Sequence, residues 1–214
     1  MAIPLRERRR QLLRDEILQA AGALLNEKGY AAISMDELAS CAGISKPTLY
    51  SHFANKEDLI FAAVMHWFDQ IDQAVQNDPT PRTPLQQLTF VLRIALQMQI
   101  DHGALSPRPW SPEVFQIVRQ REEGLARLRQ IDAVVSELVL AGMHKGEINR
   151  SLDAAAVVRA FFALLNALNS PFFKLRPYDR AVQFSEIVLN PGTIADTLAE
   201  IFERGVRAPI STPQ

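Results

Sequence analysis

Two helix-start signals lie eleven residues apart in this chain, one on each side of Gly43. The first is Ser34, which opens a Ser-x-x-Glu capping box. The second is Ser45 or Lys46, because Pro47 fits the first turn of a helix and disfavours helical geometry in the residue before it. Gly43 supplies the stop between the two helices. The spacing therefore predicts two short helices with a tight connection, the pattern called helix-turn-helix.

Apolar residues on both sides of this pair recur at the helical period. They predict a helix from about Arg9 to Lys28, which Gly29 ends. A longer helix is expected from Lys56 towards Asn77, with Asn55 as its cap. The rest of the chain shows helical spacing and no alternating strand pattern, so we predict an all-α fold. Further helices are expected at 85–102, 113–122, 125–144, 153–169 and 191–207, the last two capped by Asp153 and Asn190.

The third helix has faces of different character. At about 100° per residue, Leu49 and Phe53 share the face that packs inward. The opposite face carries short side chains that would meet bases in a DNA major groove, and the flanks carry longer donors that would meet phosphates. The outward residues are Pro47, Thr48 and Ser51, and the flanking residues are Lys46, Tyr50 and His52.

These residues also carry a family resemblance. The runs AISMDELA (32–39) and AGISKPTLYSHFANKEDL (42–59) resemble the DNA-binding domain of the tetracycline-repressor (TetR) family, over roughly residues 9–65. The resemblance implies that Lys46, Pro47 and Thr48 approach bases, whereas Ser34, Tyr50, His52 and Lys56 contact phosphates. The full set of expected DNA-binding residues is Ser34, Ser45, Lys46, Pro47, Thr48, Tyr50, Ser51, His52 and Lys56. The resemblance further implies a helical C-terminal domain, dimerisation through its last two long helices, and release from DNA by a ligand.

Charge is distributed unevenly along the chain. The formal net charge of −1 does not itself indicate a nucleic-acid partner. Residues 1–14, however, hold five arginines against Glu7 alone, a surplus of four positive charges. Such a run is either a solvated tail or a basic arm that contacts phosphates or a minor groove. The neighbouring helix-turn-helix favours the arm.

Aromatic residues concentrate after position 60, where thirteen of the sixteen lie. Such side chains either pack a core or line an apolar ligand pocket that contains a few polar anchors. The candidate pocket residues are Trp67, Phe68, Phe90, Met98, Trp110, Phe115, Phe161 and Phe162, with Gln99, His102 and Asn166 as polar anchors. Core packing remains the alternative for each of them.

The helix expected at 153–169 is apolar on nearly every face after Arg159, and a partner subunit is the simplest cover for it. We therefore expect a homodimer in which this helix and the helix at 191–207 form a four-helix bundle with their counterparts. The expected interface residues are Ala160, Phe161, Leu164, Leu168, Ile194, Leu198, Ile201 and Phe202.

Several classes of function receive no support from the sequence. The four histidines and the single Cys41 share no metal-ligand spacing, and we expect no metal, no cofactor and a buried Cys41 thiol. No catalytic motif is present, so we do not expect an enzyme. The N-terminus has no apolar signal segment, and the longest apolar run is too short for a bilayer. We therefore expect a soluble cytoplasmic protein without a membrane partner.

These expectations combine into one functional hypothesis. Residues 1–60 would hold the basic arm and the three-helix DNA-binding domain, and residues 61–214 would bind ligand and dimerise. The protein would repress neighbouring genes until a small, largely apolar or aromatic effector released it from a palindromic operator in double-stranded DNA. Two alternatives stay open: an activator of the same family, or a helical small-molecule-binding bundle whose N-terminal unit makes protein contacts.

Overall fold

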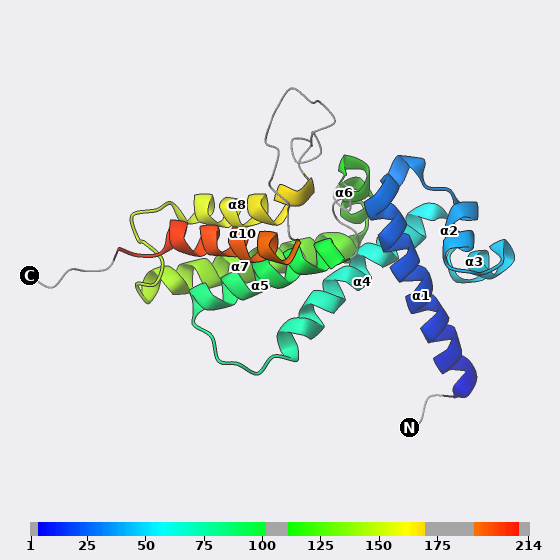
Figure 1. The fold of residues 1–214 in the computed structure, drawn as a ribbon, viewed down its shortest axis with the longest axis horizontal. Coiled ribbons are helices and arrows are strands. Elements are labelled where there is room, and N and C mark those ends of the chain that lie inside the picture. The colour runs from blue at the N-terminus through cyan, green and yellow to red at the C-terminus, as the bar shows by residue number, and fades with distance from the viewer. Residues whose placement is uncertain (1–3, 102–110, 170–190, 210–214) are drawn as a thin grey trace, which may run out of the picture. The chain divides into compact units, whose positions relative to one another are not determined.

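The computed structural model describes residues 4–101, 111–169 and 191–209. Over these residues every regular element is a helix apart from one isolated bridge, so the all-α prediction is confirmed (Figure 1). The helices are α1 (Leu5–Lys28), η1 (Tyr30–Ala32), α2 (Met35–Cys41), α3 (Lys46–His52), α4 (Lys56–Gln76), α5 (Pro84–Asp101), α6 (Pro112–Arg119), α7 (Glu122–His144), α8 (Ala154–Leu165), η2 (Ala167–Asn169) and α10 (Pro191–Val206). Among the helices described, none combines the length and the apolar character that crossing a bilayer requires.

The chain divides into two compact units. Unit 1 comprises residues 1–70 and 102–125, and unit 2 comprises residues 71–101 and 126–214. Among the described elements, unit 1 holds α1, α2, α3, α6 and most of α4. Unit 2 holds α5, α8, α10 and most of α7.

Apolar faces of α1, α2, α3 and α4 pack together in the core of unit 1. Ile17 of α1, Leu38 of α2, Leu49 of α3 and Leu59 of α4 are each exposed by 1% or less. Helix α1 packs against α2, and α2 packs against α3. Full burial of one such side chain contributes about 1.5–3 kcal/mol. These contacts hold in place two helices that are too short to be stable alone.

Unit 2 is organised around α5. Leu88, Leu92 and Leu96 follow one another at four-residue spacing along α5, and all three are fully buried. Helix α10 packs most extensively against α5, and α8 packs against both. Phe161 of α8 meets Phe202 of α10 edge to face, with 5.6 Å between ring centroids. An edge-to-face arrangement stabilises a pair of aromatic rings in addition to the effect of their burial.

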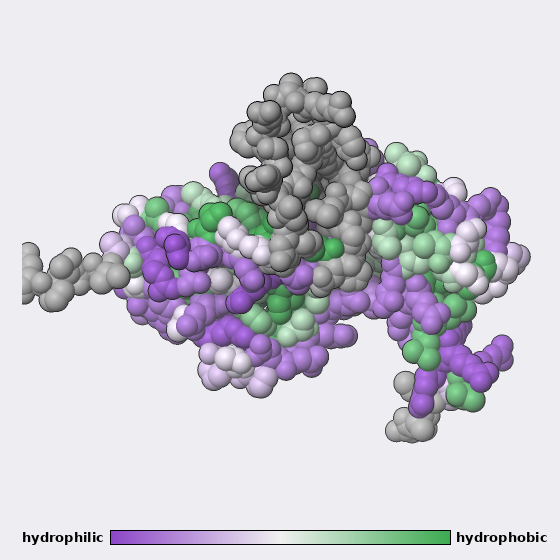
Figure 2. Space-filling model, in the orientation of Figure 1, coloured by the Kyte–Doolittle hydropathy of each residue, from purple (hydrophilic) through white to green (hydrophobic). Residues whose placement is uncertain are grey.

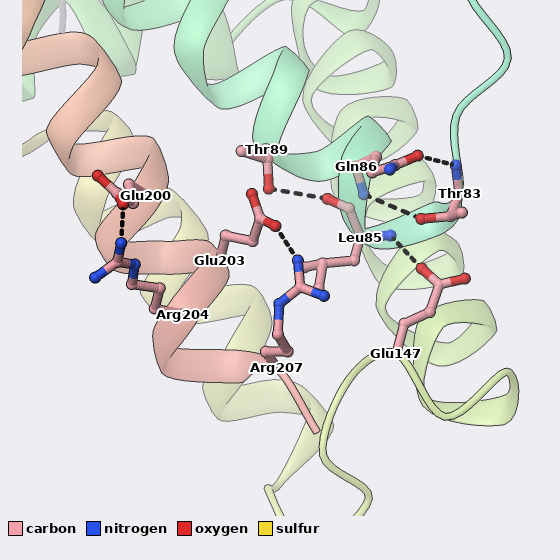
Figure 3. A network of polar contacts seen from close by, with 9 residues as sticks. All are labelled: Thr83, Leu85, Gln86, Thr89, Glu147, Glu200, Glu203, Arg204 and Arg207. Atoms are coloured by element: carbon pink, nitrogen blue, oxygen red, sulfur yellow. Dashed lines mark hydrogen bonds and ion pairs between the residues drawn. The ribbon is translucent and has the colours of Figure 1, made fainter. Parts of the chain in front are cut away.

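Polar contacts connect the elements of unit 2 where α5 begins and α10 ends (Figure 3). The N–H of Leu85 donates to the Glu147 carboxylate over 3.0 Å, and a carboxylate suits the positive end of a helix. The N–H of Asn149 donates to the carbonyl of Val206, and that of Ala208 donates to the carbonyl of Glu147, both over 2.9 Å. The segment after α7 is therefore bonded to the start of α5 and to the end of α10.

Helix starts and stops follow the predicted signals closely. Four predicted caps accept a backbone N–H from the first turn: Ser34, Ser45, Asn55 and Asp153. The predicted cap Asn190 lies outside the described residues. Gly29, Gly43 and Gly146 have φ of 73°, 65° and 74° at the predicted stops. Only glycine adopts such values without strain, which explains why these helices end there.

Several helix boundaries differ from the prediction by three or four residues. Helix α1 begins at Leu5 rather than near Arg9, so the arginines expected in an arm lie on a helix. Helix α8 ends at Leu165, and the short helix η2 follows it. Helix α7 begins at Glu122, and Gly124 lies inside its first turn instead of separating two helices. A Cβ on Gly124 would lie 2.2 Å from the carbonyl oxygen of Val118, so this glycine permits a close approach of two chain segments.

The prediction of a buried Cys41 is wrong, because its side chain is exposed. Helix α2 turns Leu38 and Ala39 towards the core. At 100° per residue, Cys41 lies about 110° around the helix from the midpoint of those two residues. The thiol is therefore outside the buried stripe.

Replacing Gly124 tests the close approach at the start of α7. Gly124→Ala is expected to lower the free energy of unfolding by about 1–3 kcal/mol, because the added methyl group must displace the Val118 carbonyl or bend α7. Gly22→Ala on α1 is the matched control, since a Cβ there meets nothing within 4 Å. Alanine favours a helix interior over glycine by about 0.8–1 kcal/mol, so this variant should gain stability. Urea unfolding followed by circular dichroism compares them, and equal stability of the two variants would contradict the packing argument.

Candidate nucleic-acid interface

Helix α3 is held at both ends. The Thr48 N–H donates to the Ser45 hydroxyl over 3.3 Å, and Pro47 occupies the first turn. At the other end, the Phe53 N–H donates to the carbonyl of Leu49 over 3.0 Å. These bonds satisfy backbone groups that a seven-residue helix would otherwise leave to water.

The faces of α3 lie as the sequence predicts. Leu49 is fully buried and Phe53 is 4% exposed, so both point into the core of unit 1. The outward and flanking side chains are accessible to a ligand. Lys46, Pro47, Tyr50 and Ser51 are exposed, and Thr48 and His52 are half-buried. Tyr50 is 45% exposed, which is high for a large aromatic residue.

Hydrogen bonds order the outward face of α3. The hydroxyls of Ser45 and Thr48 lie 2.7 Å apart, and the Ser51 hydroxyl donates to the Thr48 carbonyl over 2.7 Å. Lys46 forms an ion pair of 2.6 Å with Asp36 of α2, and this carboxylate raises the pKa of Lys46. Short polar groups with fixed directions, beside one exposed ammonium group, suit contact with base edges and phosphates.

Ser34 is the N-cap of α2, and its hydroxyl accepts the Glu37 N–H over 3.2 Å. The Glu37 carboxylate pairs with Lys28, the last residue of α1. That pairing lowers the pKa of Glu37 and raises the pKa of Lys28. The residue predicted to complete the capping box therefore also ties α1 to α2.

The position of Lys56 adds a role that the sequence did not reveal. Its ammonium group donates to the carbonyls of Tyr30 and Ile33 over 2.9 and 3.0 Å. The same group lies 4.1 Å from the centroid of the Tyr30 ring. Two of its three N–H donors are therefore bound within the protein. Lys56 joins the first turn of α4 to the connection between α1 and α2.

Arginines of α1 reach the end of α3. The guanidinium of Arg14 lies over the ring of Phe53, 4.5 Å from its centroid. Burial, and then the positive charges of Arg10 and Arg14, lower the pKa of His52. The sequence predicts that Arg10 and Arg14 belong to a basic arm, but it does not place either residue beside α3. The signal that identifies them is their helical spacing.

The candidate pocket residues are divided between the two units. Trp67, Phe68 and Phe115 belong to unit 1, and Phe90, Met98, Gln99, Phe161, Phe162 and Asn166 belong to unit 2. His102 and Trp110 lie outside the described residues. Phe115 is 39% exposed, and the guanidinium of Arg82 covers the Phe90 ring at 3.4 Å. Gln99 is 2% exposed and donates to the Leu165 carbonyl over 3.1 Å, so it joins α5 to α8. The pocket stays a prediction.

The expected interface residues fall into two groups. Phe161, Leu168 and Phe202 are each 2% exposed and belong to the core of unit 2, so a partner subunit cannot contact them appreciably. The other five are accessible to different degrees. Ala160 and Ile201 are exposed, and Leu164, Ile194 and Leu198 are half-buried. Three of the eight residues thus lie in the protomer core, because sequence periodicity does not separate two adjacent apolar stripes on one helix, and the interface stays a prediction.

The bonds made by Lys56 lead to a test of its structural role. Lys56→Met should lower the free energy of unfolding by about 1–3 kcal/mol, because two carbonyls in a partly buried position lose their charged donor. Lys46→Met is the matched control and should leave stability nearly unchanged, because its ion pair with Asp36 is exposed. Chemical unfolding measures both. Equal stabilities of the two variants would show that the Lys56 bonds contribute nothing to the fold.

Comparison with known proteins shows which family the residues of this interface resemble. Residues 17–63 match the model of bacterial regulatory proteins, tetR family. The HTH-type transcriptional activator FasR of Mycolicibacterium smegmatis is 40% identical over 88 residues, which cover 41% of this chain and 39% of FasR. The HTH-type transcriptional repressor KstR of Rhodococcus jostii is 36% identical over 89 residues, which cover 41% of this chain and 42% of KstR. The matches thus span about two fifths of each of these relatives.

A likeness in fold extends over most of the chain. The crystal structure of AibR in complex with isovaleryl coenzyme A and operator DNA superposes with a TM-score of 0.60 at 24% identity, covering 88% of this chain and 97% of AibR. The family match begins at Ile17, a buried residue of α1, and ends at Ala63 in α4. It therefore contains the caps, the buried leucines and the outward face of α3. Residues 17–63 therefore resemble the N-terminal domain of the tetR family of bacterial regulatory proteins, and α2 and α3 lie where its helix-turn-helix is expected.

Proposed function

We propose that this protein is a homodimeric transcriptional regulator that binds a palindromic DNA operator and releases it when a small molecule binds. The observation that carries the proposal is the contrast between the two faces of α3. Leu49 is fully buried, whereas the opposite face presents exposed polar groups in fixed directions. A structural helix has no need for such an accessible polar face, but a helix in a major groove does.

The residues of the interface divide into two roles. Lys46, Pro47, Thr48 and Ser51 face the bases, and Ser45 orients the Thr48 hydroxyl. Ser34, Tyr50, His52 and Lys56 contact phosphates, Lys56 through its remaining N–H donor. Base contacts give sequence preference, whereas phosphate contacts fix the position of the protein on the duplex.

Repression is the direction of regulation that we propose, with activation as the alternative. KstR carries the name of a repressor and FasR that of an activator, so family membership is compatible with both. A repressor needs only to bind and release an operator, and AibR shows that a protein of this fold accommodates a small molecule and operator DNA. We place the DNA-binding residues in 1–60 and the effector and dimer residues in 61–214. The effector is small and largely apolar or aromatic, and the protein acts in the cytoplasm on neighbouring genes.

The apolar surfaces of α8 and α10 support the homodimer. Ala195, Ala199, Phe202 and Val206 form the buried face of α10. A second apolar face, formed by Ile194, Leu198, Ile201 and Gly205, lies about 100° around the same helix. On α8, Ala156, Ala160 and Ala163 form an exposed face of small residues that permits close helix packing. A partner copy would cover both faces, and an obligate interface of this kind buries about 2,000 Å² or more.

The proposed function is tested first by DNA binding. Duplex DNA from upstream of the gene that encodes this protein is the probe, and a coding-sequence duplex of equal length is the control. Specific binding should retard the upstream probe at a protein concentration that leaves the control free. Retardation of neither probe would favour the alternative in which the N-terminal unit makes protein contacts. Equal retardation of both probes would show DNA binding without an operator in the upstream region.

Base readout by α3 leads to a specificity test. Thr48→Ala should flatten base preference at one position of each half-site, a change of about 1–3 kcal/mol at that base pair. Tyr50→Phe is the contrasting variant, because loss of a phosphate contact weakens binding to all sequences alike. Selection from a random DNA pool measures both preferences. An unchanged preference in Thr48→Ala would assign base readout to Lys46 or to other residues.

The dimer proposal is tested by charging its exposed apolar face. Ile201→Arg should yield monomers and abolish specific DNA binding, because arginine cannot be buried there without a partner. Ile201 is 54% exposed in the protomer, so the substitution leaves the protomer core intact. Leu140→Arg on α7 is the control, since Leu140 is 58% exposed. Sedimentation velocity reports the oligomeric state, and a dimeric Ile201→Arg protein with normal operator affinity would place the interface elsewhere.

A further inference from the structure

The first turns of α1 form an exposed charged helix. Every residue from Leu5 to Leu12 is exposed. Among the described residues, Arg6, Arg8, Arg9 and Arg10 form no ion pair within the protein. Figure 1 shows this part of α1 extending from the rest of unit 1, and Figure 2 shows a mainly hydrophilic surface over it. These positive charges are therefore accessible to a partner.

One face of this exposed segment is aligned with the face of α1 that packs on the rest of unit 1. Arg6, Arg10 and Arg14 follow at four-residue spacing and lie in line with the buried residues Ile17 and Ala21. We call these three arginines the basic stripe. At 1.5 Å per residue the basic stripe is about 12 Å long.

The basic stripe begins beside the recognition helix. Arg14 lies over the ring of Phe53, the residue that ends α3. Arg10 is close enough to His52, the last residue of α3, to lower its pKa. Arg6 lies one turn further from α3. The opposite face of α1 is different in character, because Arg8 and Arg9 share it with the exposed apolar residues Leu5 and Leu12.

The position of these charges is unfavourable for the free protein. The N-terminus of a helix carries partial positive charge, so cations in its first turns oppose the helix dipole. Glu7 is the one acidic residue in the first turn, and Pro4 makes no side-chain capping bond. An external anion that paired with these charges would relieve this unfavourable interaction.

We propose that the basic stripe contacts the phosphate backbone of the same DNA duplex that α3 reads. The inference rests on the proposed function and adds a second contact surface to it. A helix with its side chains is about 10–12 Å wide, whereas the minor groove of B-DNA is about 6 Å wide. Helix α1 therefore lies over the backbone rather than in the groove, and its arginines reach phosphates rather than bases. The basic stripe increases affinity without sequence preference.

A pair of double variants of the full chain tests this inference. Arg6→Gln/Arg10→Gln removes two charges of the basic stripe, and Arg8→Gln/Arg9→Gln removes two charges of the opposite face. Both variants lose the same charge from the same helix by the same substitution. Arg14 is left in place because it packs on Phe53. Fluorescence anisotropy with a 40-base-pair duplex of random sequence measures affinity across a salt series, and circular dichroism confirms equal helix content.

The expected result is a difference between the two variants. Each lost ionic phosphate contact makes the slope of log K against log salt shallower by about 0.9, so the stripe variant should change by about 1.8 per bound protomer. The control variant should keep the wild-type slope. Equal changes in the two variants, or no change in either, would overturn the inference. Altered base preference of the stripe variant in a random-pool selection would also overturn it, in favour of minor-groove contact. Failure of the wild-type protein to bind any duplex would refute the proposed function instead.

Discussion

The stability of a seven-residue helix is the constraint on which the proposed function depends. Such a helix does not persist alone in water, because nucleation costs more than its few hydrogen bonds return. Helix α3 persists because Leu49 is fully buried and Ser45 caps its first turn. Burial of Leu49 fixes the rotation of α3 about its axis. The direction of the polar face is then determined by packing inside unit 1, without any contact to DNA.

The features that could be predicted from the sequence are those made by neighbouring residues. A cap joins residues three apart, as at Ser45 and Thr48, and a glycine stop needs only its own φ. The contacts that could not be predicted join distant residues: Lys56 binds carbonyls 26 and 23 residues before it. The close approach of Gly124 to Val118 similarly depends on where two helices meet. Nothing in a local pattern encodes such meetings, so the ranges predicted from the sequence, 113–122 and 125–144, leave Gly124 outside both helices.

Unit 2 shows a second reason why some contacts cannot be predicted from the sequence. Helix α10 carries two apolar faces about 100° apart, and the period of 3.6 identifies both without saying which lies inside. The structure buries Phe202 and leaves Ile201 exposed, although the two residues are adjacent. Aromatic content is equally ambiguous, because the Phe90 ring packs under Arg82 and the Phe161 ring packs against Phe202. The aromatic and apolar content of the sequence is therefore compatible with a pocket, an interface or a core. Only the burial of each side chain in the structure distinguishes core residues from residues that a ligand or a partner subunit can reach.

The two lysines that the family resemblance assigns to DNA differ in how readily each can change partner. Lys46 is paired with Asp36 at the surface, where water and salt screen the ion pair, so a phosphate can replace the carboxylate at little cost. The hydrogen bond to the Asp36 carboxylate also raises the pKa of Lys46. Lys56 is bound to two backbone carbonyls in a partly buried position, and withdrawing it would leave both acceptors unsatisfied. In the proposed interface, Lys46 is therefore the cation that can exchange its partner. Lys56 holds the start of α4 beside the connection between α1 and α2, so the phosphate contact proposed for it must be made from that position.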